Sequence, residues 1–167
     1  SESTVGAIPV LGESLRLRTE QNATSSLHFA LFFCNAEQIL WERRMKFKIV
    51  TNNPLVKKEL GEHHNVELIE TDYRQLLVNV RDQVHMGYKL YSHPLSGSVK
   101  PNETPYKSII VSLSPGALDV DSVQMIESSI ITCDKFRVKY PEMPEGMKND
   151  FQLIDLVLIK GALSQIN

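Results

Sequence analysis

The strongest constraint on the fold is an alternation of strand-like and helix-like segments from residue 45 onward. Residues 46–51 and 66–70 are β-branched and alternate in polarity, and residues 88–92 and 108–113 have a similar character. Helical patterns separate the first three of these segments, and such an order implies right-handed crossovers. The sequence therefore predicts an α/β fold: a small three-layer sandwich whose four-stranded, mainly parallel, Rossmann-like sheet has helices on both faces. The direction of the fourth strand stays open, because a long connection precedes it.

Capping residues mark where the helices begin. Asn53 precedes a proline and predicts a helix over 54–60 that ends at Gly61. Asp72, with a glutamine three residues later, predicts the next helix, which Gly87 closes. Either Asp119 or Asp121 can cap a third helix.

Apolar stripes indicate which helix faces are buried. The last helix carries apolar residues at i, i+4, i+7 and i+11, which predicts an amphipathic helix docked on the sheet through about residue 163. These residues are Met147, Phe151, Ile154 and Leu158.

The chain divides near Met45. Residues 45–167 read as a single α/β domain, whereas residues 1–44 are turn-rich and polar, apart from an apolar stretch at 27–41. Glu42-Arg43-Arg44 admits codons that resemble a bacterial ribosome-binding site, so residues 1–44 are either a non-native or upstream-translated extension or a genuine arm that packs on the domain.

Composition excludes several classes of protein. The formal net charge is −2, which argues against a nucleic-acid partner held by bulk electrostatics. The two cysteines, Cys34 and Cys133, form no CxxC pair, which favours free thiols and a reducing, cytoplasmic location. No apolar run reaches the roughly 20 residues of a membrane span, and we expect no membrane partner. The adjacent His63 and His64 do not have zinc-ligand spacing, so we expect neither a metal nor another cofactor.

The connection between residues 93 and 108 is the candidate functional segment. It has no helical periodicity, and its three prolines favour one held shape. Loops of this length are usually functional or disordered. We therefore expect it to face a ligand or a partner.

Polar residues gather where the predicted strands end, the position at which open α/β sheets bind ligands. The predicted binding residues are Asn52, Asn53, His93, Ser96, Gly97, Ser98, Lys100, Asn102 and Thr104. Ser96-Gly97-Ser98 with Lys100 suits an anion but matches no Walker or Rossmann motif. Asn53 also has a plain interpretation as a helix cap.

His93 is the candidate catalytic residue, because a histidine titrates near neutral pH. Its alternative role is to hold the loop before Pro94. Spacing in the sequence assigns it no serine, cysteine or carboxylate partner.

Three segments carry a resemblance to the GrdX family. They are residues 48–56 (Lys-Ile-Val-Thr-Asn-Asn-Pro-Leu-Val), the whole of 93–108, and the helix around 130–134. The resemblance covers about residues 45–140. It implies a small bacterial protein encoded beside components of the glycine, sarcosine and betaine reductases, with an accessory role in amino-acid fermentation.

Three functions remain open. The first is an accessory binding protein that holds a small anionic ligand or a reductase component through the 93–108 loop. The second is a small enzyme for an amino-acid-derived or phosphorylated substrate, with His93 as acid/base, Lys100 as anion clamp and Asn52 as orienting residue. The third is a structural module that forms a homodimer.

Overall fold

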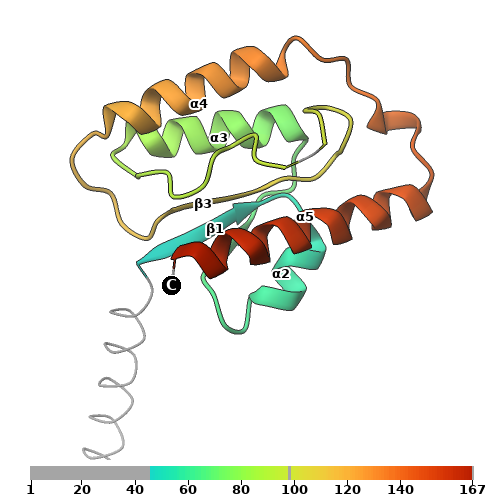
Figure 1. Cartoon of the computed structure of the whole chain (residues 1–167), viewed down its shortest axis with the longest axis horizontal. Helices are drawn as coiled ribbons and strands as arrows, with labels where there is room; N and C mark the ends of the chain where they lie inside the picture. The colour runs from blue at the N-terminus through green and yellow to red at the C-terminus, as the bar shows by residue number, and fades with distance from the viewer. Residues whose placement is uncertain (1–45, 98, 167) are drawn as a thin grey trace, which may run out of the picture. The chain divides into compact units, whose positions relative to one another are not determined.

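A computed structural model describes residues 46–97 and 99–166 (Figure 1), so the expectations about residues 1–44 and Ser98 lie outside the described residues. The elements follow in the order β1 (Phe47–Thr51), α2 (Pro54–Leu60), β2 (Val66–Leu68), α3 (Tyr73–His85), β3 (Ser108–Ser112), α4 (Val120–Cys133), a short 3-10 helix (Tyr140–Glu142) and α5 (Glu145–Ile166).

The described sheet is three-stranded and mixed, with the order β2-β1-β3. β1 pairs in parallel with β2, where Ile49 lies opposite Val66, and antiparallel with β3, where Ile49 lies opposite Ile110. The chain is α/β, but the prediction of a four-stranded, mainly parallel, Rossmann-like sheet is wrong. The loop turns the chain back at one end of the sheet, so β3 runs antiparallel to β1.

The predicted strand at 88–92 is reduced to one bridge between Leu90 and Val111. Serine hydroxyls occupy the backbone groups that a continuous ladder would use. The N–H of Lys89 donates to Ser112 Oγ at 3.0 Å, and the N–H of Ile110 donates to Ser92 Oγ at 2.9 Å. A hydroxyl offers the backbone an alternative to strand pairing, which explains why this segment stays irregular.

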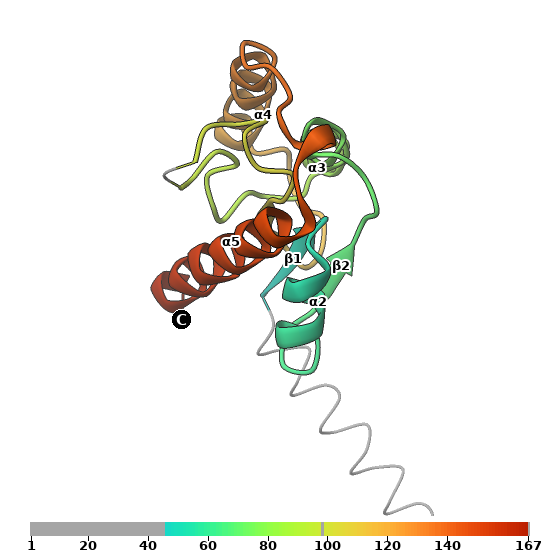
Figure 2. The same cartoon turned by 90° about the vertical axis from the view of Figure 1, so that its right-hand side faces the viewer.

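Helices cover both faces of the sheet (Figures 1 and 2). α3 and α4 pack on the face of Val50, Ile109 and Val111, whereas α2 and α5 pack on the opposite face. Phe47, Ile49 and Ile110 supply that second face. Side chains alternate between faces along a strand, so neighbouring residues of β1 and β3 enter different layers of the core.

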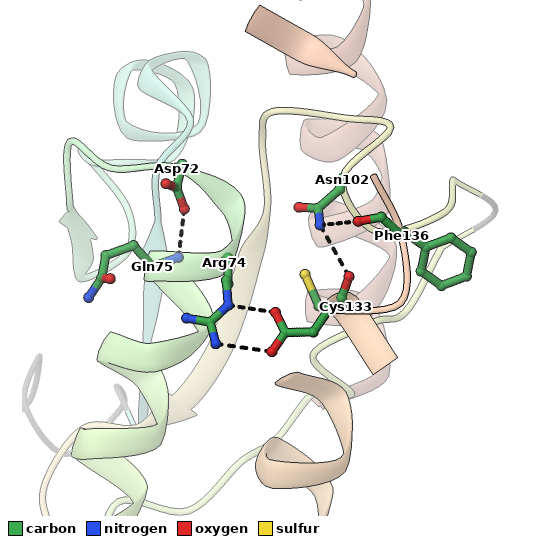
Figure 3. A network of polar contacts seen from close by, with 7 residues as sticks. Asp72, Arg74, Gln75, Asn102, Cys133 and Phe136 are labelled. Atoms are coloured by element: carbon green, nitrogen blue, oxygen red, sulfur yellow. Dashed lines mark hydrogen bonds and ion pairs between the residues drawn. The ribbon is translucent and has the colours of Figure 1, made fainter. Parts of the chain in front are cut away.

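The predicted caps are confirmed. Asn53 accepts a hydrogen bond from the N–H of Leu55, and Asp72 accepts one from the N–H of Gln75 (Figure 3). Asp119, and not Asp121, caps α4 through the N–H of Ser122. These local rules set the helix starts without help from the rest of the fold.

The predicted docking face of α5 is wrong. Met147, Ile154 and Leu158 keep 49%, 41% and 37% of their surface exposed. The buried residues are instead Asp155, Leu156, Ile159 and Leu163. Apolar side chains occur on every side of this helix, so spacing alone selects no face. The buried carboxylate of Asp155 is tied to the sheet and fixes the rotation of the helix.

Candidate functional site

Asp155 lies at the centre of a buried polar network where β1 ends and β3 begins. Its carboxylate accepts hydrogen bonds from Ser108 N (2.9 Å), Ser108 Oγ (2.7 Å) and Asn53 Nδ2 (3.0 Å). The Ser108 hydroxyl also lies 2.7 Å from Thr51 Oγ1. The network joins α5 to both strands through buried hydrogen bonds.

Asn52 and Asn53 serve different parts of this network. Asn53 is fully buried, and its amide donates to Gln152 O as well as to Asp155. Asn52 donates to Thr71 O and Pro105 O and accepts from the N–H of Lys107. Asn52 therefore fixes the end of the loop, and Asn53 anchors α5.

Lys107 brings a second buried charge to the site. Only 5% of its surface is exposed, and Nζ donates to the carbonyl oxygen of Ser96 at 2.5 Å. In the described part of the chain its ammonium forms no ion pair with a carboxylate. Burial lowers the pKa of Lys107, and the charge of Asp155 opposes that shift.

The same environment acts on Asp155 in the opposite sense. Burial raises the pKa of its carboxyl group, while the bonds from Asn53 and Ser108 and the charge of Lys107 counteract the rise. Burial therefore disfavours the charged form of both groups. Such groups are costly to bury unless hydrogen bonds or opposite charges compensate them.

A small hollow opens beside Lys107. Its volume is about 20 Å³, which is room for one water-sized group. Its lining comes from the loop, from Tyr73 at the start of α3, and from α5. Gly97 has a φ of +127°, and a Cβ there would lie 2.8 Å from Leu158 Cδ1. The loop therefore touches α5 along the rim of the hollow.

Two larger hollows flank the small one. A hollow of about 460 Å³ lies at the start of α5 and shares Phe151 with the small one. Another of about 390 Å³ lies near the end of α5 and shares Ser96 with it. The three hollows therefore form a row along one side of α5.

The remaining predicted binding residues divide between surface and interior. His93 is exposed in the hollow near the end of α5, and its Nδ1 accepts from the N–H of Leu95. Lys100 is exposed, whereas Thr104 is buried and bonds to the N–H of Tyr106. The structure brings Ser96, Gly97 and Thr104 together around the small hollow, but it keeps Lys100 outside that lining.

Asn102 has a structural environment. Its φ is 64°, and its amide donates to Cys133 O (3.1 Å) and Phe136 O (3.0 Å), as Figure 3 shows. These bonds tie the middle of the loop to the end of α4. Nearby, Arg74 holds Asp134 through two hydrogen bonds, which link α3 to α4.

Sequence reasoning missed Lys107 and Asp155. Each had a local signal: Asp155 is a carboxylate inside an apolar helical segment, and Lys107 directly precedes a strand that is buried along most of its length. Polar residues at such positions are almost never fully buried unless they are paired, so their context was informative.

Other chemistries have less support within residues 46–97 and 99–166. No group of three or more histidine, cysteine or acidic side chains is arranged there to hold a metal ion. Cys133 is a buried free thiol whose pKa burial raises to about 11. None of the described helices is both long enough and apolar enough to cross a membrane.

Comparison with known proteins yields one match. A family model described as GrdX-like protein matches residues 48–164. The match includes most of β1, the 93–108 loop and most of α5. Neither the curated proteins nor the solved structures contain a match to this chain.

Proposed function

The chain belongs to the GrdX-like protein family, and we propose that it is an accessory binding protein of amino-acid reductase metabolism. It holds an anionic group, carried by a small ligand or a partner, between the 93–108 loop and α5. The metabolic setting follows from the family resemblance. The binding mode rests on the site around Lys107.

The buried ammonium of Lys107 is the observation that carries this proposal. Nζ has three N–H donors, and within the described residues its hydrogen bonds go to Ser96, to the carbonyl oxygen and to Oγ. A charged group in a buried site gains most from an acceptor of opposite charge. An anionic oxygen in the adjacent hollow would supply that acceptor.

The neighbouring carboxylate does not already fill this role. Asp155 accepts three hydrogen bonds from Asn53 and Ser108, which hold it toward the strands. It affects Lys107 through its charge at longer range. A bound anion would therefore add to the network without displacing an existing ion pair.

The test is a titration of the full chain with acetate, phosphate, glycine and purified reductase components, followed by amide chemical shifts and thermal unfolding. We expect the shifts for at least one anionic probe to centre on Ser96, Gly97 and Lys107. Lys107→Met should weaken binding by about 1.5–3 kcal/mol, the range for a hydrogen bond to a charged group.

Two further variants separate binding from folding. Lys107→Met combined with Asp155→Asn removes both buried charges, so it avoids leaving one charge unpaired. Lys100→Ala removes an exposed lysine of the same loop and should leave binding unchanged. Binding that responds to Lys100→Ala but survives both Lys107 variants would refute the proposed site.

A further inference from the structure

The small hollow at Lys107 is too small for most free metabolites. It holds about 20 Å³, whereas the hollows on either side hold about 460 and 390 Å³. A single carboxylate oxygen has the size of the group that this volume admits. The flanking space is usable only by a ligand that extends in both directions from its anionic group.

Both flanking hollows combine apolar and polar lining. Met143, Pro144, Met147 and Phe151 line the hollow at the start of α5, together with Glu103, Lys139 and Glu142. Ala162 and Ile166 are the apolar part of the hollow near its end, beside Tyr91, Ser92, His93, Ser96 and Gln165. Methionine side chains adapt to varied apolar partners, which suits a surface that accepts a peptide.

The dimensions favour an extended peptide over a helix. α5 has 22 residues, or about 33 Å at 1.5 Å per residue. An extended chain covers that length with about ten residues at ~3.3 Å each. A helix is about 10–12 Å wide with its side chains, whereas the centre of the row has room for one water-sized group.

We propose that the row of three hollows, here called the α5 groove, binds an extended segment of a partner protein. An acidic side chain of the segment contacts Lys107, and apolar side chains before and after it occupy the flanking hollows. The charge complementarity at Lys107 selects this partner. The inference rests on the proposed anion site and names the carrier of the anionic group.

The experiment selects peptides on the full chain from a phage-displayed random library of about twelve residues, a length that spans the groove at ~3.3 Å per residue. We expect an enriched pattern of one Asp or Glu flanked by apolar residues. A synthetic peptide of that pattern should bind at least about tenfold more tightly than its copy with Gln or Asn at the acidic position.

Matched variants locate the contact. Met147→Asp places a charge in the groove, and Leu153→Asp places one on the same helix outside the hollows, at a residue of similar exposure (49% and 54%). Met147→Asp and Lys107→Met should each weaken the peptide about tenfold or more. Leu153→Asp should leave the affinity for the peptide unchanged. If this variant folds, a charge at a half-exposed position of α5 does not by itself unfold the protein, which is the control that the Met147 variant needs.

Each other outcome overturns the inference. If the selection enriches no peptide, or enriches only peptides that lack an acidic residue, the proposed peptide partner is wrong. If acetate binds at Lys107 while no peptide binds better, the proposed function stands and the groove assignment fails. If wild type dimerises and Met147→Asp abolishes that association, a second copy of the chain occupies the groove instead.

Discussion

Single side chains at the end of the sheet connect parts of the chain that lie far apart in sequence. The carboxylate of Asp155 on α5 accepts hydrogen bonds from Asn53, which follows β1, and from Ser108, which begins β3. Lys107 holds the loop through the Ser96 carbonyl. Removing one member of such a set leaves a buried group unpaired, which costs more than the pair itself contributes.

The buried carboxyl group should make stability depend on pH. Because burial raises the pKa of Asp155 above its ordinary 3.8, the folded state holds a proton in a window above 3.8 that the unfolded state has lost. Stability should therefore fall as pH rises through that window and recover as pH falls toward 3.8.

Asp155→Asn should remove the contribution of this carboxyl group to the slope of the unfolding free energy against pH. Urea unfolding over a pH series from about 3.8 to neutrality measures it. Asp150→Asn, at an exposed position of the same helix, is the matched control and should keep the wild-type slope. Equal slopes for the wild type and Asp155→Asn would contradict the prediction.

Asn102 offers a test of how the loop is held. Asn102→Gly keeps the left-handed backbone (φ 64°) but loses two hydrogen bonds to carbonyls. At about 0.5–1.5 kcal/mol for each bond, we expect a loss of about 1–3 kcal/mol in the free energy of unfolding.

Asn102→Ala should cost about 1 kcal/mol more, because alanine is strained at positive φ. Denaturant unfolding of the two variants compares them directly. An alanine variant as stable as the glycine variant would show that the backbone shape at this position is not needed.

At the scale of elements, buried polar groups decide how α5 is rotated and where strands pair. The spacing of apolar residues does not decide either. Asp155 turns α5 so that Leu156, Ile159 and Leu163 enter the core. The hydroxyls of Ser112 and Ser92 interrupt strand pairing at 88–92. In both cases a buried polar atom requires a partner, and that requirement overrides a pattern that is ambiguous by itself.

The rotation of α5 predicts unequal effects of truncating its apolar residues. Leu156→Ala should destabilise the fold by about 2–5 kcal/mol, since it leaves a cavity against the sheet. Met147→Ala, at a half-exposed position, should stay within about ±0.5 kcal/mol. Thermal and urea unfolding give both values, and a larger loss at Met147 would support the docking face expected from spacing.

At the scale of the whole molecule, two apolar clusters lie on opposite faces of a small mixed sheet. Both draw their residues from the range 47–166. The polar network lies at one end of the sheet, where the loop, α3 and α5 meet. The candidate site therefore lies between the loop, the start of α3 and α5.

We predict that residues 45–167 fold without the preceding segment. We expect a fragment lacking residues 1–44 to remain monodisperse and to melt within a few degrees of the full chain, because burial of each core side chain, worth roughly 1.5–3 kcal/mol, is retained. Calorimetry and light scattering on both proteins test this. Aggregation of the fragment, or a large fall in its melting temperature, would contradict it.

The sequence by itself determined the helix starts and most of the strand positions. Caps such as Asn53, Asp72 and Asp119 act on backbone groups two or three residues away, so their effect is readable locally. Alternation in residues 46–51 likewise predicted β1. The resemblance to the GrdX family was also carried by short contiguous segments, and the match over residues 48–164 confirms it.

Only the tertiary structure decided the direction of β3, the loss of the strand at 88–92, the rotation of α5 and the meeting of Lys107 with Asp155. Lys107 and Asp155 lie 48 positions apart, and what unites them is desolvation in a shared site. Desolvation depends on every element that packs around a group. The apolar context of each residue was a local signal of its burial, but no local pattern shows that the two residues share one site.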